Sequence, residues 1–163
     1  MNENQSGGNA VIAIGSDHAG YPLKEALIEE LTTLGYQFKD FGTFSLESVD
    51  YPDIGREVAE AVAAGKFERA ILICGTGIGI SITANKVKGI RAAVCSESFS
   101  ARMSRAHNDA NVLAMGARVV GTGLAVEIAK AFLETEFEAG RHKRRVDKIE
   151  ALDNSEEGTC GCK

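Results

Sequence analysis

The chain has 163 residues, of which 44% are hydrophobic and 25% charged, so it can build one α/β domain with a substantial core and is too short for two. Its formal net charge of -5 argues against a nucleic-acid-binding or membrane-binding surface, because both need a positive field. No apolar run is long enough to cross a bilayer and the polar start does not resemble a signal peptide, so a cytoplasmic location is expected.

The first predicted unit is a strand, a loop and a helix. Val11–Ile14 is a short, branched apolar run that ends at a glycine, which is typical of a buried parallel strand. A loop at residues 15–20 follows it. After Pro22, apolar residues recur at helical spacing as far as Leu34, and Gly35 is a natural helix stop.

The middle of the chain repeats this alternation. Residues 36–41 alternate weakly, as an edge strand does, and a second helix is predicted at about 54–64. The most strand-like run is 70–74, and the glycine-rich turn 75–79 leads from it into a helix that extends towards Lys86.

The remaining elements are shorter strands and longer helices. Strands are predicted at 90–94 and 112–115, with a helix at 98–105 between them. A long helix is expected at about 124–138, and a final helix with a basic start at 140–154.

Strands that alternate with helices predict right-handed βαβ crossovers. The predicted fold class is therefore α/β, a single doubly wound, Rossmann-like domain with a five-stranded parallel sheet and helices on both faces. We expect the domain to span residues 10–154, between a flexible N-terminus at 1–9 and a disordered polar tail at 155–163. Ligand sites in such sheets lie at the carboxyl ends of the strands.

Cys74 and the glycine-rich turn after it are the most informative feature. The glycines allow backbone N–H groups to converge on an anion, although such a turn can also serve tight packing alone and here lacks the lysine of a nucleotide-binding loop. At the end of a strand, oriented amides favour the thiolate, which can accept a proton. A lone buried cysteine is more often structural, so its neighbours decide. Cys160 and Cys162 lie in the polar tail, and no disulfide framework is predicted.

Two further pairs of polar residues follow predicted elements. Asp17 and His18 lie after the first strand, at the same sheet edge as Cys74 if the two strands are neighbours, although an aspartate there can also merely cap a helix. His107 and Asn108 are expected in the connection between a helix and the last strand, where a histidine is often only a polar loop residue.

Basic residues stand out in this acidic chain. Arg118 and the run 141–145 could bind phosphate oxygens through paired hydrogen bonds, or could form a solvated helix face. Zinc binding by His18, Cys74 and His107 is conceivable from residue types, but no closely spaced pair of ligands is present. No metal and no cofactor are therefore predicted.

Taken together, the motifs resemble the ribose-5-phosphate isomerase B family over about Val11–Leu152, in order and without obvious gaps. The motifs that carry the resemblance are Gly15–Gly20, Asp50–Asp53, Cys74–Ser81, Ala84–Lys86, Gly89–Ala92, Ser104–Asn111, Gly116–Gly121 and Gly140–Val146. The resemblance implies an aldose-ketose isomerase that interconverts ribose 5-phosphate and ribulose 5-phosphate in the non-oxidative branch of the pentose phosphate pathway. It also implies a homodimer whose active sites are assembled from both subunits, and leaves pairing of dimers into tetramers open.

The resemblance also implies residue roles. Cys74 would move the proton between C1 and C2, His107 would open the furanose ring by acid catalysis, and Thr76 would assist. Some family members have a glutamate as the base and lack this cysteine, so the sequence has the cysteine form. The substrate-binding residues implied are Asp17, His18, the oxyanion-hole residues Gly75, Gly77, Ile78 and Gly79, Asn108 for a sugar hydroxyl, and Arg118, Arg141 and Arg145 for the phosphate.

Two alternatives stay open at this point. One is an isomerase of allose or galactose 6-phosphate, which pocket depth would decide. The other is a non-catalytic domain that binds a sugar phosphate, for which the fold, the glycine turn and the arginines would suffice. The presence of both Cys74 and His107 favours catalysis, because a pure binding domain needs neither a thiolate base nor a ring-opening acid.

Overall fold

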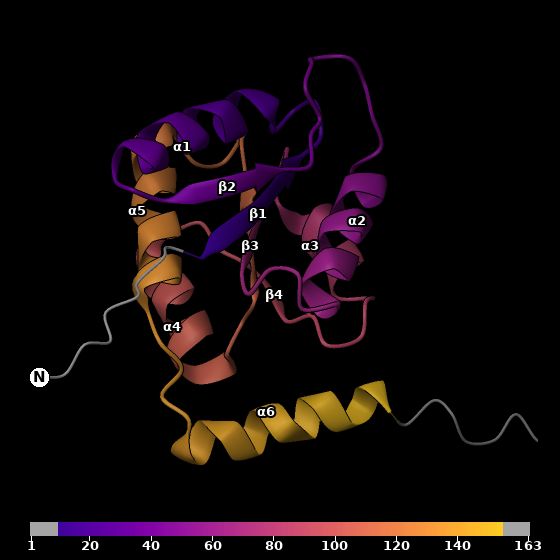
Figure 1. Ribbon diagram of the computed structural model, residues 1–163, viewed down its shortest axis with the longest axis vertical. Helices are drawn as coiled ribbons and strands as arrows, with labels where there is room; N and C mark the ends of the chain where they lie inside the picture. Colours follow the sequence, from indigo (N-terminus) through magenta and orange to yellow (C-terminus); the bar gives the residue numbers. More distant parts are fainter. Residues whose placement is uncertain (1–9, 155–163) are drawn as a thin grey trace, which may run out of the picture.

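In the computed structural model, which describes residues 10–154, six helices surround five strands (Figure 1). The predicted N-terminal segment 1–9 and polar tail 155–163, with Cys160 and Cys162, lie outside the described residues. The elements in chain order are β1 (Val11–Ser16), α1 (Tyr21–Thr33), β2 (Gln37–Asp40), α2 (Tyr51–Ala63), β3 (Ala70–Cys74), α3 (Ile78–Ala84), β4 (Ala92–Val94), α4 (Ser98–Asn108), β5 (Val112–Gly116), α5 (Thr122–Glu134) and α6 (Gly140–Asp153).

The five strands form one parallel sheet in the order β2-β1-β3-β5-β4, which confirms the predicted α/β fold class and the edge position of β2. From β1 the chain passes to β2 at one edge of the sheet, and from β3 it passes to β4 at the other edge. The strand order thus reverses between β1 and β3, where Ser16 is in register with Ile73. Ligands of open parallel sheets bind in the crevice that opens outside the carboxyl ends of the strands at such a point.

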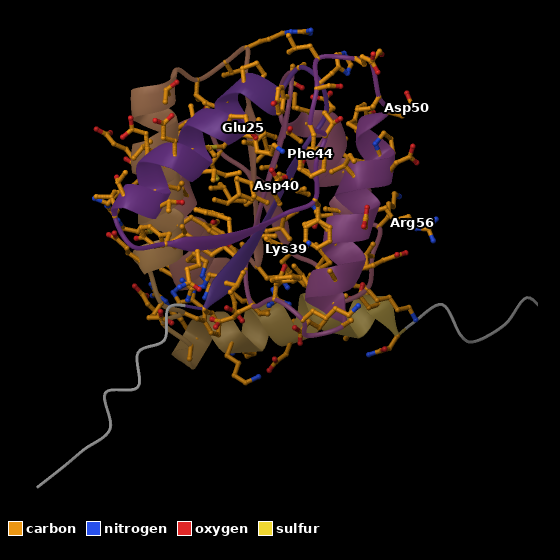
Figure 2. All side chains as sticks on the ribbon, turned by 45° about the horizontal axis from the view of Figure 1, so that its top comes forward. Glu25, Lys39, Asp40, Phe44, Asp50 and Arg56 are labelled. Carbon is orange, nitrogen blue, oxygen red and sulfur yellow. The ribbon has the colours of Figure 1, made fainter. Side chains whose placement is uncertain are left out.

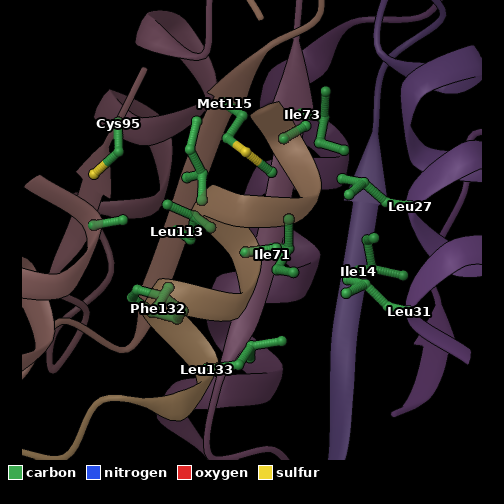
Figure 3. Packing of buried hydrophobic residues seen from close by; sticks show 14 of the residues in the cluster. Ile14, Leu27, Leu31, Ile71, Ile73, Cys95, Leu113, Met115, Phe132 and Leu133 are labelled. Carbon is green, nitrogen blue, oxygen red and sulfur yellow. The ribbon is translucent and has the colours of Figure 1, made fainter. Parts of the chain in front are cut away.

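Helices cover both faces of the sheet. On one face, α1, α4 and α5 bury apolar side chains against the strands; Figure 3 shows Leu27 and Leu31 of α1 and Phe132 of α5 directed at the sheet. On the other face, Val58 of α2 and Ile80 of α3 pack against the same strands. Every residue of β3 and β5 is buried, as expected of central strands covered on both sides.

The largest correction concerns α4, which was predicted to end near Arg105 and instead continues to Asn108. No glycine stops it; Asp109 adopts the left-handed conformation that ends it, with φ of 47°. His107 and Asn108 therefore lie in the last turn of a helix, not in a connection. Since α4 runs antiparallel to the strands, this turn lies near the amino edge of the sheet, opposite the end of β3.

Other boundaries differ by a few residues. Helix α2 begins at Tyr51 instead of about residue 54, because Pro52 is well suited to the first turn of a helix. Helix α5 ends at Glu134 instead of about 138, where Thr135 turns extended. Strand β4 is confined to Ala92–Val94. No helix among the described residues is both long and apolar enough to cross a membrane.

Helix α6 lies across the amino edge of the sheet, below α4 and β4 in Figure 1. Its attachments there are largely polar: Arg91 Nη1 lies 2.7 Å from Glu150 Oε1, and the N–H of Gly89 donates to Asp153 Oδ2 at 2.8 Å. His142 and Val146 are its buried residues. The helix therefore adds its basic start to the end of the sheet that is remote from Cys74.

Gly116, the last residue of β5, allows the glycine-rich turn to approach the sheet closely. A Cβ at this position would lie 2.6 Å from the carbonyl carbon of Thr76. We predict that Gly116→Ala lowers the free energy of unfolding by about 1–3 kcal/mol, as overpacking does.

Gly123 in the first turn of α5 is the matched control, because a Cβ there meets nothing within 4 Å. Urea unfolding followed by circular dichroism should show Gly123→Ala at least as stable as the native chain. Equal stability of the two variants would contradict the close approach at Gly116.

Candidate active site

A cavity of about 410 Å³ opens at the carboxyl ends of β1 and β3, where the strand order reverses. The β1–α1 loop, the β3–α3 turn, the start of α2 and the β5–α5 loop supply its walls. Its lining residues are Asp17, His18, Ala19, Tyr51, Cys74, Gly75, Thr76, Ile78, Gly79 and Arg118. The structure thus brings together eight of the predicted site residues: Asp17, His18, Cys74, Gly75, Thr76, Ile78, Gly79 and Arg118.

Cys74 is the last residue of β3, and only 4% of it is exposed. The backbone N–H of Gly77 donates to its Sγ atom at 3.2 Å. Gly77 has a φ of 77°, and a Cβ on it would lie 2.7 Å from the carbonyl carbon of Met115. Only glycine fits this turn, so the glycine-rich sequence fixes the sulfur at the cavity through a backbone amide.

The amides of the turn are not all directed at the cavity. Gly77 donates to the cysteine sulfur, and the Ile78 N–H donates to Thr76 Oγ1 at 3.3 Å. Both residues were predicted to bind an oxyanion through these amides. Gly75 and Gly79, the other two predicted donors, line the cavity.

Asp17 and His18 stand beside Cys74 because β1 and β3 are neighbours, as the sequence predicted. Asp17 accepts a hydrogen bond from the backbone N–H of Gly20 at 2.9 Å, within the loop before α1. No side chain caps the start of α1, so the alternative of a helix-capping aspartate is wrong. His18 is half-buried, and its Nδ1 accepts a hydrogen bond from the N–H of Val49 at 3.2 Å.

Arg118 brings a guanidinium to the cavity from the loop after β5. The backbone N–H of Arg118 donates to the carbonyl oxygen of Gly75 at 3.0 Å. Its side chain packs against the same glycine, where a Cβ would come within 3.2 Å of Nη1. The arginine is therefore held against the turn that carries Cys74.

Tyr51 lines the cavity but was not among the predicted site residues. Its ring occupies the space above Gly79, where a Cβ would lie 2.5 Å from Cζ and 2.7 Å from the hydroxyl oxygen. The only sequence signal for this residue was its place within the motif Asp50–Asp53.

Five predicted site residues do not line this cavity: Gly77, which lies within the turn, and His107, Asn108, Arg141 and Arg145. The latter four lie on the last turn of α4 and the first turns of α6, at the amino edge of the sheet. One chain therefore presents the predicted site as two groups, one at each end of the sheet.

The second group is organised around two stacked imidazoles. The rings of His107 and His142 are parallel within 4°, with centroids 4.1 Å apart. The Nε–H of Arg141 donates to His142 Nε2 at 3.4 Å. Glu138 approaches both rings, with Oε2 3.6 Å from His142 Nε2 and 3.9 Å from His107 Nε2.

The ligand atoms of His107, Glu138 and His142 lie within 4.8 Å of one another, the spacing of a possible metal site. However, the two rings are stacked in parallel, so their nitrogen lone pairs point side by side and do not converge on one ion. Arg141 also places a positive charge against His142. Within one chain the trio His18, Cys74 and His107 is not assembled either, because His107 lies at the other end of the sheet. The cluster is thus a hydrogen-bonded stack.

Comparison with known proteins shows the family of the chain. Residues 12–149 match the model of the Ribose/Galactose Isomerase family. The chain belongs to this family.

Its relatives match it over nearly their whole length. Ribose-5-phosphate isomerase B of Escherichia coli is 53% identical over 142 residues, which is 87% of this chain and 95% of the relative. The structure of the Clostridium thermocellum ribose-5-phosphate isomerase B superposes with a TM-score of 0.87 at 58% identity, over 89% of this chain and 98% of that one. The Mycoplasma genitalium enzyme, solved with bound ribulose-5-phosphate, gives a TM-score of 0.84 at 40% identity, over 88% and 96% of the two chains.

The burial of His142 makes the stability of this family member depend on pH. Burial lowers the pKa of His142 below its ordinary value, reinforced by His107, Arg141 and Arg145 and opposed by Glu138. The unfolded chain therefore binds a proton more readily than the folded one at about pH 6.5 and below, so stability falls as the pH falls through this window.

We predict that His142→Phe, which keeps an aromatic ring in the stack but cannot titrate, weakens this dependence. The free energy of unfolding in urea should drop less between about pH 7 and pH 5 in the variant than in the native chain. Equal drops in both proteins would show that another group carries the effect.

Proposed function

We propose that the chain is a ribose-5-phosphate isomerase that interconverts ribose 5-phosphate and ribulose 5-phosphate by proton transfer. The observation that carries this proposal is the placement of the Cys74 thiol, with Asp17, His18 and Arg118, around one cavity at the switch point of the sheet. The activities and bound sugar of the relatives support the same reaction. They also favour a five-carbon sugar over allose or galactose 6-phosphate.

The reaction removes a proton next to a carbonyl group and returns it to the neighbouring carbon. In the proposed mechanism, the thiolate of Cys74 takes the proton from C2 of the open-chain aldose and delivers it to C1. The hydroxyl proton on O2 passes to O1, which leaves the carbonyl group at C2. The enediolate formed in between carries negative charge on oxygen, which needs hydrogen-bond donors placed in advance. The turn at residues 75–79 lies beside the sulfur. In the proposal the backbone amides of Gly75 and Gly79 serve this purpose, since those of Gly77 and Ile78 are bonded within the turn.

The phosphate group does not react, but its binding can hold the sugar in the reactive orientation. Arg118 is the guanidinium that lines the cavity, and in the proposal it binds the phosphate together with arginines from a second chain. Asp17 and His18 contact the sugar phosphate from the β1–α1 loop.

Ring opening requires an acid, and His107 is the proposed one. Since His107, Asn108, Arg141 and Arg145 lie at the far end of the sheet, a single chain has an incomplete site. We infer a homodimer in which the last turn of α4 and the start of α6 of one protomer complete the cavity of its partner. Asn108 then holds a sugar hydroxyl, and Arg141 and Arg145 bind the phosphate.

The domain extent and the location of the protein are inferred from its core and its cysteines. We propose that residues 10–154 act as one domain, since both apolar clusters pack on one sheet. A cytoplasmic location suits the two buried cysteines, Cys74 and Cys95, which are both free thiols.

Replacing the proposed base provides the direct test. We predict that Cys74→Ala lowers kcat for ribose 5-phosphate by about 10²–10⁴-fold, the usual contribution of a positioned base. Activity of the native chain should persist in EDTA, because the proposed proton transfer uses a thiolate. The assay follows ribulose 5-phosphate formation and includes allose 6-phosphate as a second substrate.

Cys95→Ala is the matched control. Cys95 is equally buried, and burial, with a smaller effect of Glu97, raises its pKa to about 11, which keeps it a thiol at neutral pH. Its replacement should leave kcat within about twofold of the native value. Full activity in Cys74→Ala would refute the assignment of the base, and absence of isomerisation of either sugar would favour a binding domain.

A further inference from the structure

The loop between β2 and α2, residues 41–50, is tied to the active-site cavity at both of its ends. At its start it hydrogen-bonds to the end of β1, directly before Asp17 and His18. At its end, the backbone N–H of Val49 donates a hydrogen bond to His18, and Tyr51, the next residue after the loop, lines the cavity. The loop therefore frames the part of the site that β1 provides.

Lys24 of α1 holds the start of this loop. Its side chain is fully buried, and its ammonium group has three short contacts: Asp40 Oδ1 at 2.7 Å, Asp40 Oδ2 at 2.6 Å and the carbonyl oxygen of Thr43 at 2.8 Å. The ring of Phe44 lies 4.7 Å from the Nζ atom. Figure 2 shows Asp40 and Phe44 close together between α1 and α2.

A buried ammonium group is costly to desolvate, and only complete pairing offsets this cost. Here all three N–H donors of Lys24 have acceptors. Asp40 also accepts the N–H of Gly42 at 2.8 Å, so one carboxylate joins the lysine to the backbone of the loop. The pair therefore fixes the path of the chain as it leaves β2.

The same segment extends the sheet next to β1. The N–H of Ser16 donates to the carbonyl of Gly42, and the N–H of Thr43 donates to the carbonyl of Ser16, both at 2.6 Å. This pairing places the loop directly beside the residue that precedes Asp17 and His18. A displacement of residues 42–43 would thus be transmitted to the β1–α1 loop.

At the far end of the loop, the hydrogen bond from the Val49 N–H to His18 Nδ1 selects one tautomer of His18. An Nδ1 atom that accepts a backbone N–H has no proton of its own, so the proton of the neutral ring is on Nε2. An Nε2–H group can donate to an oxygen of a sugar phosphate. With the proton on Nδ1 instead, Nε2 would be an acceptor and would repel the same oxygen.

We propose that the loop 41–50, locked by Lys24 and Asp40, fixes His18 as the Nε2–H tautomer and thereby makes it a hydrogen-bond donor to the sugar phosphate. The ligand rests on the proposed function, whereas the tautomer does not. Lys24, Asp40 and the Val49 amide are positioning groups, since they act on the substrate only through His18.

Val49→Pro removes the amide proton that His18 accepts, and Val49→Ala retains it as the matched control. Long-range ¹H–¹⁵N NMR of the imidazoles, without substrate, should show His18 Nδ1 unprotonated in the native chain and in Val49→Ala. His18→Gln identifies the signal among the three histidines of the chain. In Val49→Pro the Nδ1 signal should move towards the value averaged over both tautomers.

The kinetic consequence is a change in KM with kcat retained, which marks lost binding instead of lost chemistry. Val49→Pro should raise KM for ribose 5-phosphate roughly three- to tenfold, as expected for one weakened hydrogen bond, and Val49→Ala should not. A native His18 with its proton on Nδ1, or an unchanged His18 signal in Val49→Pro, would overturn the proposal.

The role of the buried pair is tested by Lys24→Met/Asp40→Asn, which removes both charges and retains an acceptor for the Gly42 N–H. If the pair positions His18, this variant gives the His18 signal and the KM of Val49→Pro while its circular dichroism remains native. A folded double variant with native His18 signals and native KM would contradict the positioning role and show that Lys24 and Asp40 only stabilise the fold. If the native chain fails to isomerise ribose 5-phosphate, only the proposed function is lost, since the NMR result needs no substrate.

Discussion

The reversal of strand order between β1 and β3 is the constraint on which the rest of the site depends. It opens a crevice at the carboxyl edge of the sheet, and it makes the loop after β1 a neighbour of the turn after β3. Cys74, Asp17 and His18 come together for this reason alone, although more than fifty residues separate them in sequence. The arginine after β5 lines the same cavity because β5 is the other neighbour of β3.

Close packing then determines which residues can occupy this edge. The turn after Cys74 approaches β5 so tightly that side chains are excluded at Gly77 and Gly116. The same closeness brings a backbone amide to the cysteine sulfur and a guanidinium to the turn. Tyr51 fills the space left by Gly79, so the glycines also shape the cavity wall.

Local sequence patterns predicted the sheet, its parallel strands and the part of the site built by strand ends. Such features follow from apolar runs and glycines that lie next to one another in the chain. The predicted end of α4 was wrong because Asp109, and not a glycine, adopts the left-handed conformation that ends the helix. Tyr51, the stacking of His107 on His142 and the contact of Val49 with His18 were missed because they join distant segments.

The division of the proposed catalytic groups between two ends of one chain is the central claim, and subunit complementation tests it most directly. Cys74→Ala and His107→Asn chains, each inactive on cyclic ribose 5-phosphate, are mixed, unfolded and refolded together. Random pairing makes half of the dimers mixed, each with one intact site, so the account predicts about a quarter of native activity. No recovery in dimers shown to be mixed would contradict a site shared between protomers.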